Sequence, residues 1–303
     1  MTRSFTFLVN PASGDGAAPE AVLPVARQLR EAGARVDVVS SSGPRAVAAL
    51  VARAVERADV VVSVGGDGTL SHLVGEVCAG GGVLGLLPAG RGNDFARMLG
   101  LPTEPGEVAE LLLHGAERRV DLLSWQAPGA PERLVAGSVY SGVDARAAAL
   151  VDRMRWTPKP LQYPLGAVRA LATYQPGRFR VVVDGAVAEY AAATVVVANS
   201  GYYGQGMRIA PSARVDDGLL DVVVVEAASR LELIRRFPRI YGGSHVELPE
   251  VTVLTGRRVE VAADSRVPVG ADGEALGELP GLGGPPAVPA VVEIRPGALR
   301  VIG

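Results

Sequence analysis

Residues 60–69 read Val-Val-Val-Ser-Val-Gly-Gly-Asp-Gly-Thr, and this stretch decides how the first third of the chain folds. Its β-branched beginning predicts a buried strand, and residues 70–78 after it predict a helix. Three glycines therefore lie in a strand-to-helix turn, where backbone N–H groups can approach phosphate closely. Asp67 is the exception in this turn. A carboxylate beside phosphate is repulsive unless a metal or a proton transfer accounts for it.

The alternation of strand and helix extends on both sides of this turn. The pattern predicts strands at residues 5–9, 35–40, 60–64 and 83–87, and helices at 19–32, 44–58, 70–78, 93–99 and 105–114. Continuous apolar strands that alternate with helices indicate a parallel sheet covered on both faces. We therefore expect an N-terminal α/β domain of the Rossmann-like kind.

The pattern changes near residue 121. Short strands separated by turns are expected at residues 134–140, 178–183, 192–198, 220–225, 251–254, 259–262 and 291–294, with helices only at 165–174 and 230–240. Many short strands of this kind favour an antiparallel β-sandwich. The predicted domains are residues 1–122 and 123–294, and the segment 295–303 could return to the first domain.

Composition narrows the class of protein. The 303 residues are 48% hydrophobic and carry a net charge of −2, which gives no reason to expect nucleic acid as a partner. Cys78 is the only cysteine, so a disulfide framework and a thiolate zinc cluster are excluded. We expect a cytoplasmic protein. The sequence has no signal-peptide pattern and no apolar run of the roughly 18 residues that span a membrane, so membrane association would be peripheral.

Two common phosphate-binding patterns are absent. A Walker loop needs a Gly-Lys pair, but the only lysine, Lys159, stands between two prolines. A dinucleotide fingerprint fails after the first strand, because Pro19 stands where its third glycine would be. From the residues alone, Asp67 could instead cap a helix, and Ser13 could belong to an ordinary turn.

Five motifs in order carry a resemblance to a known family. They are Asn10-Pro11-Ala12-Ser13-Gly14, Gly65-Gly66-Asp67-Gly68-Thr69, the segment 88–97, the segment 216–221 and Asp272-Gly273-Glu274. In this combination the chain resembles the diacylglycerol/sphingosine kinase family of lipid kinases. The resemblance covers nearly the whole chain. It implies an ATP-binding α/β domain, a β-sandwich domain for the lipid acceptor, and an active site in the cleft between them.

The resemblance implies a set of nucleotide contacts. ATP phosphates would lie on the glycine turn, and the further contacts would come from Asn10, Ser13, Gly14, Ser40, Gly65, Gly66, Asp67, Gly68, Thr69, Arg91, Asn93 and Glu274. The family often has Thr where this chain has Arg91. That substitution removes a hydroxyl, although a guanidinium could supply positive charge to phosphate. The residues also allow Asn93 or Asp94 to be a helix cap.

The resemblance also implies the catalytic and metal residues. Asp272 would be the general base that accepts the proton of the lipid hydroxyl, while Asp67 and Asp121 orient the phosphate and Mg²⁺ network. A Mg²⁺ site would use Asp217 and the carbonyls of Arg214 and Leu219. Each assignment has an alternative: Asp272 and Asp217 each precede glycine as in a turn, and Asp121 could pair on the surface with Arg118 or Arg119.

The function expected from this resemblance is transfer of the γ-phosphate of ATP to a lipid hydroxyl. Diacylglycerol, giving phosphatidic acid, is the leading acceptor. Other acceptors stay open: a sphingoid base, another lipid alcohol, or a soluble substrate like that of NAD kinases. The chain could also bind a nucleotide or lipid without catalysis.

Membrane contact is a further expectation. Basic residues gather at Arg153, Arg155 and Lys159, and again at Arg230, Arg235, Arg236 and Arg239. Such clusters can hold a protein on anionic lipid, although a solvated helix face has the same composition. Trp125, Trp156 and Tyr163 could line an acyl-chain cleft, although core packing is the better interpretation for two of the three. A homodimer stays open.

Overall fold

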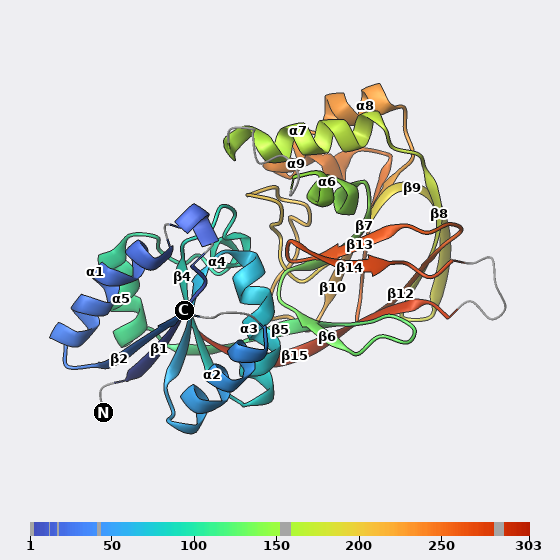
Figure 1. The fold of residues 1–303 in the computed structure, drawn as a ribbon. Coiled ribbons are helices and arrows are strands. Elements are labelled where there is room, and N and C mark those ends of the chain that lie inside the picture. The colour runs from blue at the N-terminus through green and yellow to red at the C-terminus, as the bar shows by residue number, and fades with distance from the viewer. Residues whose placement is uncertain (1–2, 12, 17, 41–43, 152–158, 282–287) are drawn as a thin grey trace. The chain divides into compact units, whose positions relative to one another are not determined.

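The computed structural model describes residues 3–11, 13–16, 18–40, 44–151, 159–281 and 288–303. The chain forms two compact units. One comprises Met1–Leu122 together with Pro296–Gly303, and the other comprises Leu123–Arg295. The chain passes from one unit to the other twice, within strand β5 (Glu117–Gln126) and within strand β15 (Ala290–Ile302). Figure 1 shows both units in one view.

The N-terminal unit alternates strands and helices as the sequence predicts. Its elements before β5 are β1 (Ser4–Val9), η1 (Ser13–Gly16), α1 (Ala18–Glu31), β2 (Arg35–Ser40), α2 (Pro44–Glu56), β3 (Val60–Gly65), α3 (Asp67–Ala79), β4 (Val83–Pro88), α4 (Asp94–Met98) and α5 (Pro105–His114). Helix α3 begins three residues earlier than expected, inside the glycine turn itself. The end of β15 lies beside β4, so the last residues belong to this unit.

Strands β15-β4-β3-β1-β2 of the N-terminal sheet lie in this order, and each neighbouring pair in this row is parallel. The register places Val9 beside both Ser40 and Val64, and Val64 beside Leu87. The carboxyl ends of β1, β2, β3 and β4 therefore meet at one edge of the sheet. Open α/β sheets bind ligands at this edge.

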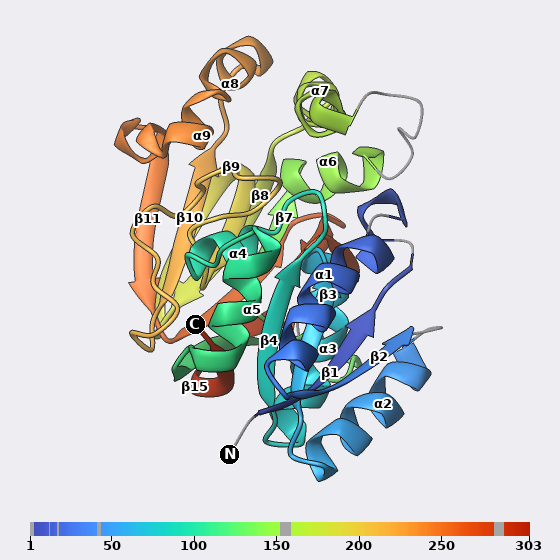
Figure 2. The ribbon, with the colours of Figure 1, turned by 90° about the vertical axis from the view of Figure 1, so that its left-hand side faces the viewer.

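Helices cover both faces of this sheet (Figure 2). On one face α1 packs against α5, and their apolar side chains form a core with Phe5, Phe7 and Val62. On the other face α2 packs against α3. Strands β3 and β4 are thus buried on both faces, which explains why they are almost continuously apolar instead of alternating, whereas the edge strand β2 is partly exposed.

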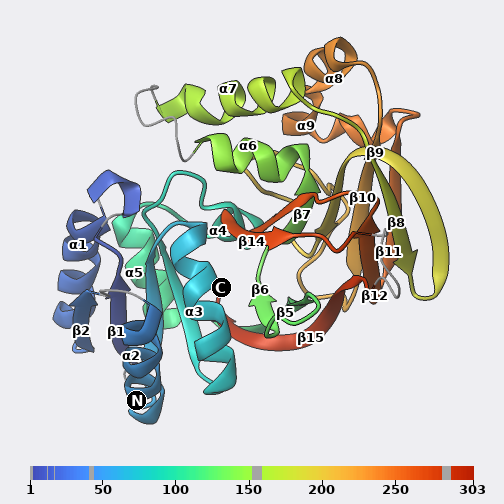
Figure 3. The same cartoon turned by 45° about the vertical axis from the view of Figure 1, so that its right-hand side comes forward.

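The C-terminal unit is built mainly of antiparallel strands. Its elements are β6 (Arg133–Val135), β7 (Ser138–Gly142), α6 (Val143–Val151), α7 (Lys159–Ala172), β8 (Gly177–Val183), β9 (Ala186–Ala198), β10 (Leu220–Glu226), α8 (Arg230–Arg236), α9 (Arg239–Gly242), η2 (Ser244–Glu247), β11 (Val251–Gly256), β12 (Arg258–Ala263), β13 (Pro268–Ala271) and β14 (Glu274–Glu278). Strand β9 pairs with β8 along its first half and with β7 and β10 along its second half. Helices α6 to α9 gather at one end of this unit (Figure 3).

The fold class expected from the sequence is confirmed for each unit: a parallel α/β unit and an antiparallel, sandwich-like unit. Two expected elements are wrong in detail. The strand expected at 134–140 is interrupted, because the N–H groups of residues 136–138 donate to the carboxylate of Asp272. The helix expected at 230–240 is two short helices, because Pro238, the N-cap of the second one, has no N–H to continue the first.

No helix in the part of the chain that the structure describes has the length and hydropathy needed to cross a bilayer.

Candidate active site

The glycine turn after β3 is closed tightly. Gly65 has a φ of +153°, and a Cβ atom at this position would lie 2.8 Å from the hydroxyl oxygen of Ser13 and closer still to that of Thr69. Gly66 is the N-cap of α3 and makes no side-chain cap. The turn therefore has no room for a side chain at Gly65, and the N-terminus of a 13-residue helix begins here.

The loops after β1 and β3 are joined by hydrogen bonds. The N–H of Gly66 donates to the hydroxyl of Ser13 at 3.1 Å, and the side-chain amide of Asn10 donates to the hydroxyl of Thr69 at 3.3 Å. The backbone N–H of Asn10 also donates to Val64 O. The structure thus brings Asn10 and Ser13 to the glycine turn.

The loop after β4 touches the same turn through backbone. A Cβ on Gly90 would lie 2.6 Å from the nitrogen of Gly66, and a Cβ on Gly66 would lie 3.1 Å from the Cα of Gly90. Asn93 holds this loop: its side-chain oxygen accepts the N–H of Gly90 at 3.0 Å, and its amide donates to Gly90 O at 3.1 Å. Three strand ends therefore meet where two glycine backbones are in contact.

Asp67 holds helix α4. Its two carboxylate oxygens accept the N–H groups of Asp94 and Phe95, each at 3.1 Å. These are orphan donors of the first turn of α4, and a carboxylate is favourable there. Neither a metal nor a proton transfer is needed to account for the acid in the glycine turn. Asp67 also lines a small cavity with Ser63, Gly65 and Asn93.

Other expected nucleotide contacts lie at or near this edge. Ser40 is exposed at the carboxyl end of β2, beside Val9 in register. Gly14 belongs to the short helix η1, directly after the loop that holds Asn10. Arg91 is exposed in the loop between β4 and α4.

Asp121 is buried in β5, with only 3% of its surface exposed. Its carboxylate accepts the N–H of Gly297 at 2.6 Å, which ties β5 to β15. The alternative of a surface pair is wrong, because Arg118 donates to Leu99 O and Arg119 donates to Gly297 O. This geometry gives Asp121 a structural bond within the N-terminal unit.

Asp272 lies in the two-residue turn between β13 and β14. Asp272 and Gly273 have φ angles of +47° and +85°, as the primed hairpin turns require. One carboxylate oxygen accepts the N–H of Ala136 at 2.8 Å, and the other accepts those of Gly137 and Ser138 at 3.0 and 3.1 Å. The hairpin-turn alternative thus describes its backbone correctly, and the carboxylate is held in one orientation.

Two neighbours complete the surroundings of Asp272. Glu274 is the first residue of β14 and is half-buried. Tyr140 is buried, and burial is the main reason that its pKa is raised; the negative charge of Asp272 raises it further, while a hydrogen bond with the Gly273 backbone opposes this. A neutral phenol therefore packs beside this turn.

The segment expected to hold Mg²⁺ is an exposed loop before β10. The carboxylate of Asp217 accepts the N–H of Leu219 at 3.0 Å, and the carboxylate of Asp216 lies 3.3 Å from Arg214. Burial raises the pKa of Asp221, and the charge of Asp217 adds to this effect, although a hydrogen bond from Ser212 opposes it. Among the described residues, no three His, Cys, Asp or Glu side chains gather in a metal-binding cluster.

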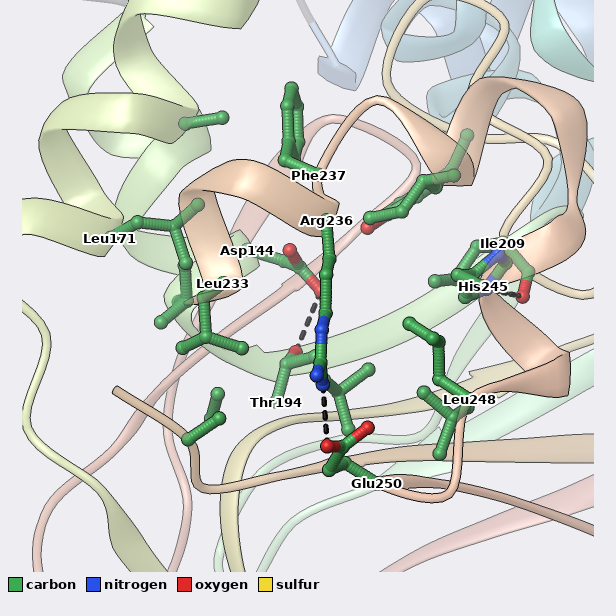
Figure 4. A pocket seen from close by; sticks show the side chains of 18 residues that line it. Asp144, Leu171, Thr194, Ile209, Leu233, Arg236, Phe237, His245, Leu248 and Glu250 are labelled. Carbon is green, nitrogen blue, oxygen red and sulfur yellow. Dashed lines mark hydrogen bonds and ion pairs between the residues drawn. The ribbon is translucent and has the colours of Figure 1, made fainter. Parts of the chain in front are cut away.

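The C-terminal unit also contains an apolar pocket that sequence reasoning missed (Figure 4). Its volume is about 70 Å³. Apolar side chains form most of its wall, and they come from α6, α7, α8, α9 and the strands below: Val143, Ala167, Leu171, Ala193, Ile209, Val225, Ala228, Leu233, Phe237, Ile240, Leu248 and Val251. Such a pocket suits a hydrocarbon chain.

Polar groups stand at defined places in this pocket. Thr194 has its hydroxyl 2.6 Å from Asp144 and 2.7 Å from Ser141 O. Burial raises the pKa of Asp144, although hydrogen bonds with Thr194 and Tyr203 oppose this. One hydroxyl proton cannot serve both oxygens, whereas a protonated Asp144 can donate to Thr194 while Thr194 donates to Ser141 O.

Arg236 and Glu250 form an ion pair of 2.5 Å at the pocket (Figure 4). His245 is buried and lies 2.9 Å from Ile209 O through Nε2, and its Nδ1 has no partner among the described residues. Burial lowers the pKa of His245, so the neutral ring is favoured.

The sequence carries little signal for this pocket. Helix α6 is alanine-rich with weak amphipathic periodicity, and Asp144 resembles an ordinary first-turn acid. Trp125 is buried in the sandwich core and does not line the pocket. Trp156, Arg153 and Arg155 lie outside the described residues, as do the side chains of Tyr163 and Lys159.

Comparisons with known proteins agree with both units. Residues 4–125 match the family model of the diacylglycerol kinase catalytic domain, and residues 137–303 match that of the YegS C-terminal NAD kinase beta sandwich-like domain. The diacylglycerol kinase of Mycobacterium tuberculosis (strain ATCC 25618 / H37Rv) is 36% identical, over 98% of this chain and 94% of that protein. The diacylglycerol kinase of Bacillus subtilis (strain 168) is 24% identical over 90% of each.

A solved structure shares the fold. The crystal structure of a diacylglycerol kinase from Bacillus anthracis str. Sterne superimposes with a TM-score of 0.72 at 18% identity, over 99% of this chain and 97% of that one.

Proposed function

This chain belongs to the diacylglycerol kinase family of lipid kinases, and we propose that it transfers the γ-phosphate of ATP to the hydroxyl of diacylglycerol. The product is phosphatidic acid. The proposal that the N-terminal unit binds ATP rests on one observation. The backbones of Gly66 and Gly90 are in contact where the ends of three strands meet. Gly65, Gly66 and Gly90 carry no Cβ atoms, so a phosphate can approach the backbone of this turn closely.

In this proposal the N-terminal unit holds the nucleotide. The N-terminus of α3 faces phosphate, and Asn10, Ser13 and Thr69 supply polar groups beside it. Arg91 would supply positive charge in place of a hydroxyl, and Ser40 would contribute a further polar contact to the nucleotide. Asp67 acts as a positioning residue, because its bonds to α4 fix the loop that carries Gly90 and Asn93.

Asp272 is the proposed proton acceptor. The lipid hydroxyl oxygen forms a bond to the γ-phosphorus, the bond from that phosphorus to the bridging oxygen of ADP breaks, and the hydroxyl proton goes to Asp272. Three backbone N–H bonds support the role, because they orient the carboxylate before substrate arrives. Glu274, two residues after Asp272, is the proposed ligand of the nucleotide or the metal.

The residues of the loop before β10 fit a Mg²⁺ ion that keeps several of its water ligands. Asp217 would provide one carboxylate, and the carbonyls of Arg214 and Leu219 would provide neutral oxygen, which suits a cation that retains several waters. The mutual repulsion of Asp217 and Asp221 would be relieved by a cation. Bound Mg²⁺ would supply charge neutralisation near this loop.

The apolar pocket supports a lipid as the acceptor. Most of its wall is apolar, and its charged pair, Arg236 with Glu250, is mutually neutralised, so an uncharged hydrocarbon chain is the best fit. An acyl chain of diacylglycerol has this chemistry. A soluble nucleotide acceptor has no comparable use for such a pocket.

The test uses labelled ATP, Mg²⁺ and a panel of lipids. We expect label in the organic phase with diacylglycerol, and label in aqueous product alone would contradict the proposal. The role of Asp272 is tested with Asp272→Asn beside Asp184→Asn, since Asp184 forms an equivalent turn elsewhere in the same unit. Transfer should be abolished in the first variant and kept in the second.

A further inference from the structure

His245 contributes an unpaired nitrogen to the wall of the apolar pocket. The residue lies in η2 and is only 2% exposed. Its Nε2 lies 2.9 Å from the carbonyl oxygen of Ile209, whereas its Nδ1 is shielded from solvent and has no hydrogen-bond partner among the described residues. A buried polar atom without a partner costs free energy, so this nitrogen requires an explanation.

The bond to Ile209 fixes which nitrogen of His245 carries the proton. A carbonyl oxygen only accepts hydrogen bonds, so Nε2 is the donor. Burial lowers the pKa of His245, which keeps the ring neutral with this single proton. Nδ1 is therefore an acceptor, and only a hydrogen-bond donor satisfies it.

The same pocket contains a second acceptor of this kind. One carboxylate oxygen of Glu250 is paired with Arg236 at 2.5 Å. The other oxygen, Oε2, is shielded from solvent and has no hydrogen bond to another described residue. Figure 4 shows His245 and Glu250 among the apolar side chains of the wall. Both atoms are acceptors, so an occupant that completes this pocket brings a donor.

The hydroxyl groups beside this pocket are engaged elsewhere. Thr194 bonds with Asp144 and Ser141 O, and Tyr203 bonds with Asp144. A water molecule has room in a cavity of about 70 Å³. A buried water typically holds two to four polar partners, however, and a lipid chain that fills the pocket displaces it. The donor that remains with the pocket full is one on the lipid itself.

We propose that His245 is a specificity-determining residue, which selects an acceptor lipid whose chain carries a hydroxyl into the pocket and donates it to Nδ1. A hydroxyl fits better than an ammonium, because a charge costs far more to bury in an apolar wall. The inference rests on the proposed function, since it narrows the acceptor to a diacylglycerol with a hydroxylated chain.

This hydroxyl is distinct from the one that receives phosphate. Asp272, the proposed proton acceptor, is not part of the pocket wall. It is linked to the wall through the rings of Tyr140 and Tyr203, whose centroids are 5.9 Å apart. The lipid therefore presents one hydroxyl at Asp272 and a second one, along its chain, at His245.

The first test observes His245 directly by ¹⁵N NMR of the full-length protein without ATP. His72 and His114 are the other two histidines, and both are exposed, so they serve as internal references. The probes are soluble short-chain diacylglycerols that each carry one hydroxyl at a different carbon of one chain, together with the unsubstituted parent. At least one hydroxylated lipid should shift the Nδ1 resonance toward that of a hydrogen-bonded acceptor, and the parent should not.

The second test compares kcat/KM for that hydroxylated lipid and its parent. The wild type should prefer the hydroxylated lipid about tenfold, the ratio that one neutral hydrogen bond can supply. His245→Leu should lose this preference and still phosphorylate the parent, because leucine restores an apolar wall. His114→Leu, on α5 of the N-terminal unit, is the control and should keep it. The NMR result needs no variant, so it decides the proposal even if His245→Leu does not fold.

Three outcomes would overturn the role of His245. No hydroxylated lipid could shift Nδ1 more than the parent does, Nδ1 could be hydrogen-bonded without lipid and stay so with it, as a held water would cause, or His245→Leu could keep the preference. The proposed function fails separately, through absence of transfer from labelled ATP to any of these lipids. A selective shift of Nδ1 without transfer would contradict the kinase proposal and leave hydroxyl recognition supported.

Discussion

Asp184 and Asp272 occupy the same place in two hairpins of the C-terminal unit. Each has a φ of +47° and is followed by a glycine, Gly185 at +89° or Gly273 at +85°. Each carboxylate accepts backbone N–H groups from a neighbouring segment: Asp184 from Arg257 and Arg258, and Asp272 from residues 136–138. The chain thus contains a structural copy of its proposed proton acceptor.

This relationship predicts similar losses of stability in Asp184→Asn and Asp272→Asn. In each variant an NH₂ group replaces an oxygen that faces an N–H donor, which should cost about 1–3 kcal/mol. Urea unfolding of the two proteins measures this. If only Asp272→Asn were destabilised, its loss of transfer could be a folding effect, and the catalytic interpretation would lose its control.

Gly90→Ala should destabilise the N-terminal unit and abolish phosphate transfer. The added methyl group would overlap the backbone of Gly66, and neither backbone can move away without breaking the turn. The expected cost is about 1–3 kcal/mol, measured by thermal unfolding. Gly75→Ala is the control: it lies inside α3 with open space around it, and should stabilise the helix by about 0.5–1 kcal/mol. An active Gly90→Ala enzyme would refute the phosphate-binding turn.

Asp217→Asn should remove the stabilisation that Mg²⁺ gives to the protein. A cation bound only to the folded state contributes about 2.7 kcal/mol at a hundredfold excess over its Kd. The readout is the shift of the unfolding midpoint with Mg²⁺, which needs no turnover. Asp216→Asn, at the residue paired with Arg214, should keep the shift. A shift that persists in Asp217→Asn would place the ion elsewhere.

Ala167→Phe should raise the KM for the lipid without changing the KM for ATP. The residue is buried on α7 and lines the apolar pocket, so the larger ring occupies space meant for a hydrocarbon chain. Steady-state kinetics with short-chain diacylglycerol tests this. Ala52→Phe on the exposed side of α2 is the control. An equal rise of the KM values for the lipid and for ATP would count against the pocket as the lipid site.

The difference in stability between Asp144→Asn and the wild type should shift in favour of the variant as pH rises above about 4. Burial raises the pKa of Asp144 in the folded state above its unfolded value of about 3.9. The stability from protonation is present below the unfolded pKa and is lost as pH rises through the folded one. Asparagine keeps a donor toward Thr194 at every pH.

Urea unfolding across this pH range measures the effect of Asp144→Asn. Asp264→Asn is an exposed comparison. A gain that does not depend on pH would contradict the proposed protonation.

Much of the N-terminal unit is predictable because its information is local. A β-branched run followed by glycines and a helical pattern predicts β3, the turn and α3 within 20 residues. Parallel pairing then places all strand carboxyl ends at one edge, so Asn10, Gly66 and Gly90 could be expected together before their contacts were known.

The roles of the individual acids were not predictable in the same way. Asp67 bonds to residues 27 and 28 positions away, Asp272 to residues 134–136 positions away, and Asp121 to a residue 176 positions away. An Asp-Gly pair has the same local sequence whether it closes a hairpin or holds a metal. Its partners depend on which distant backbone groups the fold presents.

The sequence by itself determined the two fold classes, the absence of a Walker loop, and the glycine turn, because these follow from residue type and spacing within short windows. Only the tertiary structure decided that Asp67 holds α4, that Asp184 copies the turn of Asp272, and that α6 to α9 enclose an apolar pocket. These features arise where segments far apart in the chain pack together, and packing is a property of all the contacting surfaces at once.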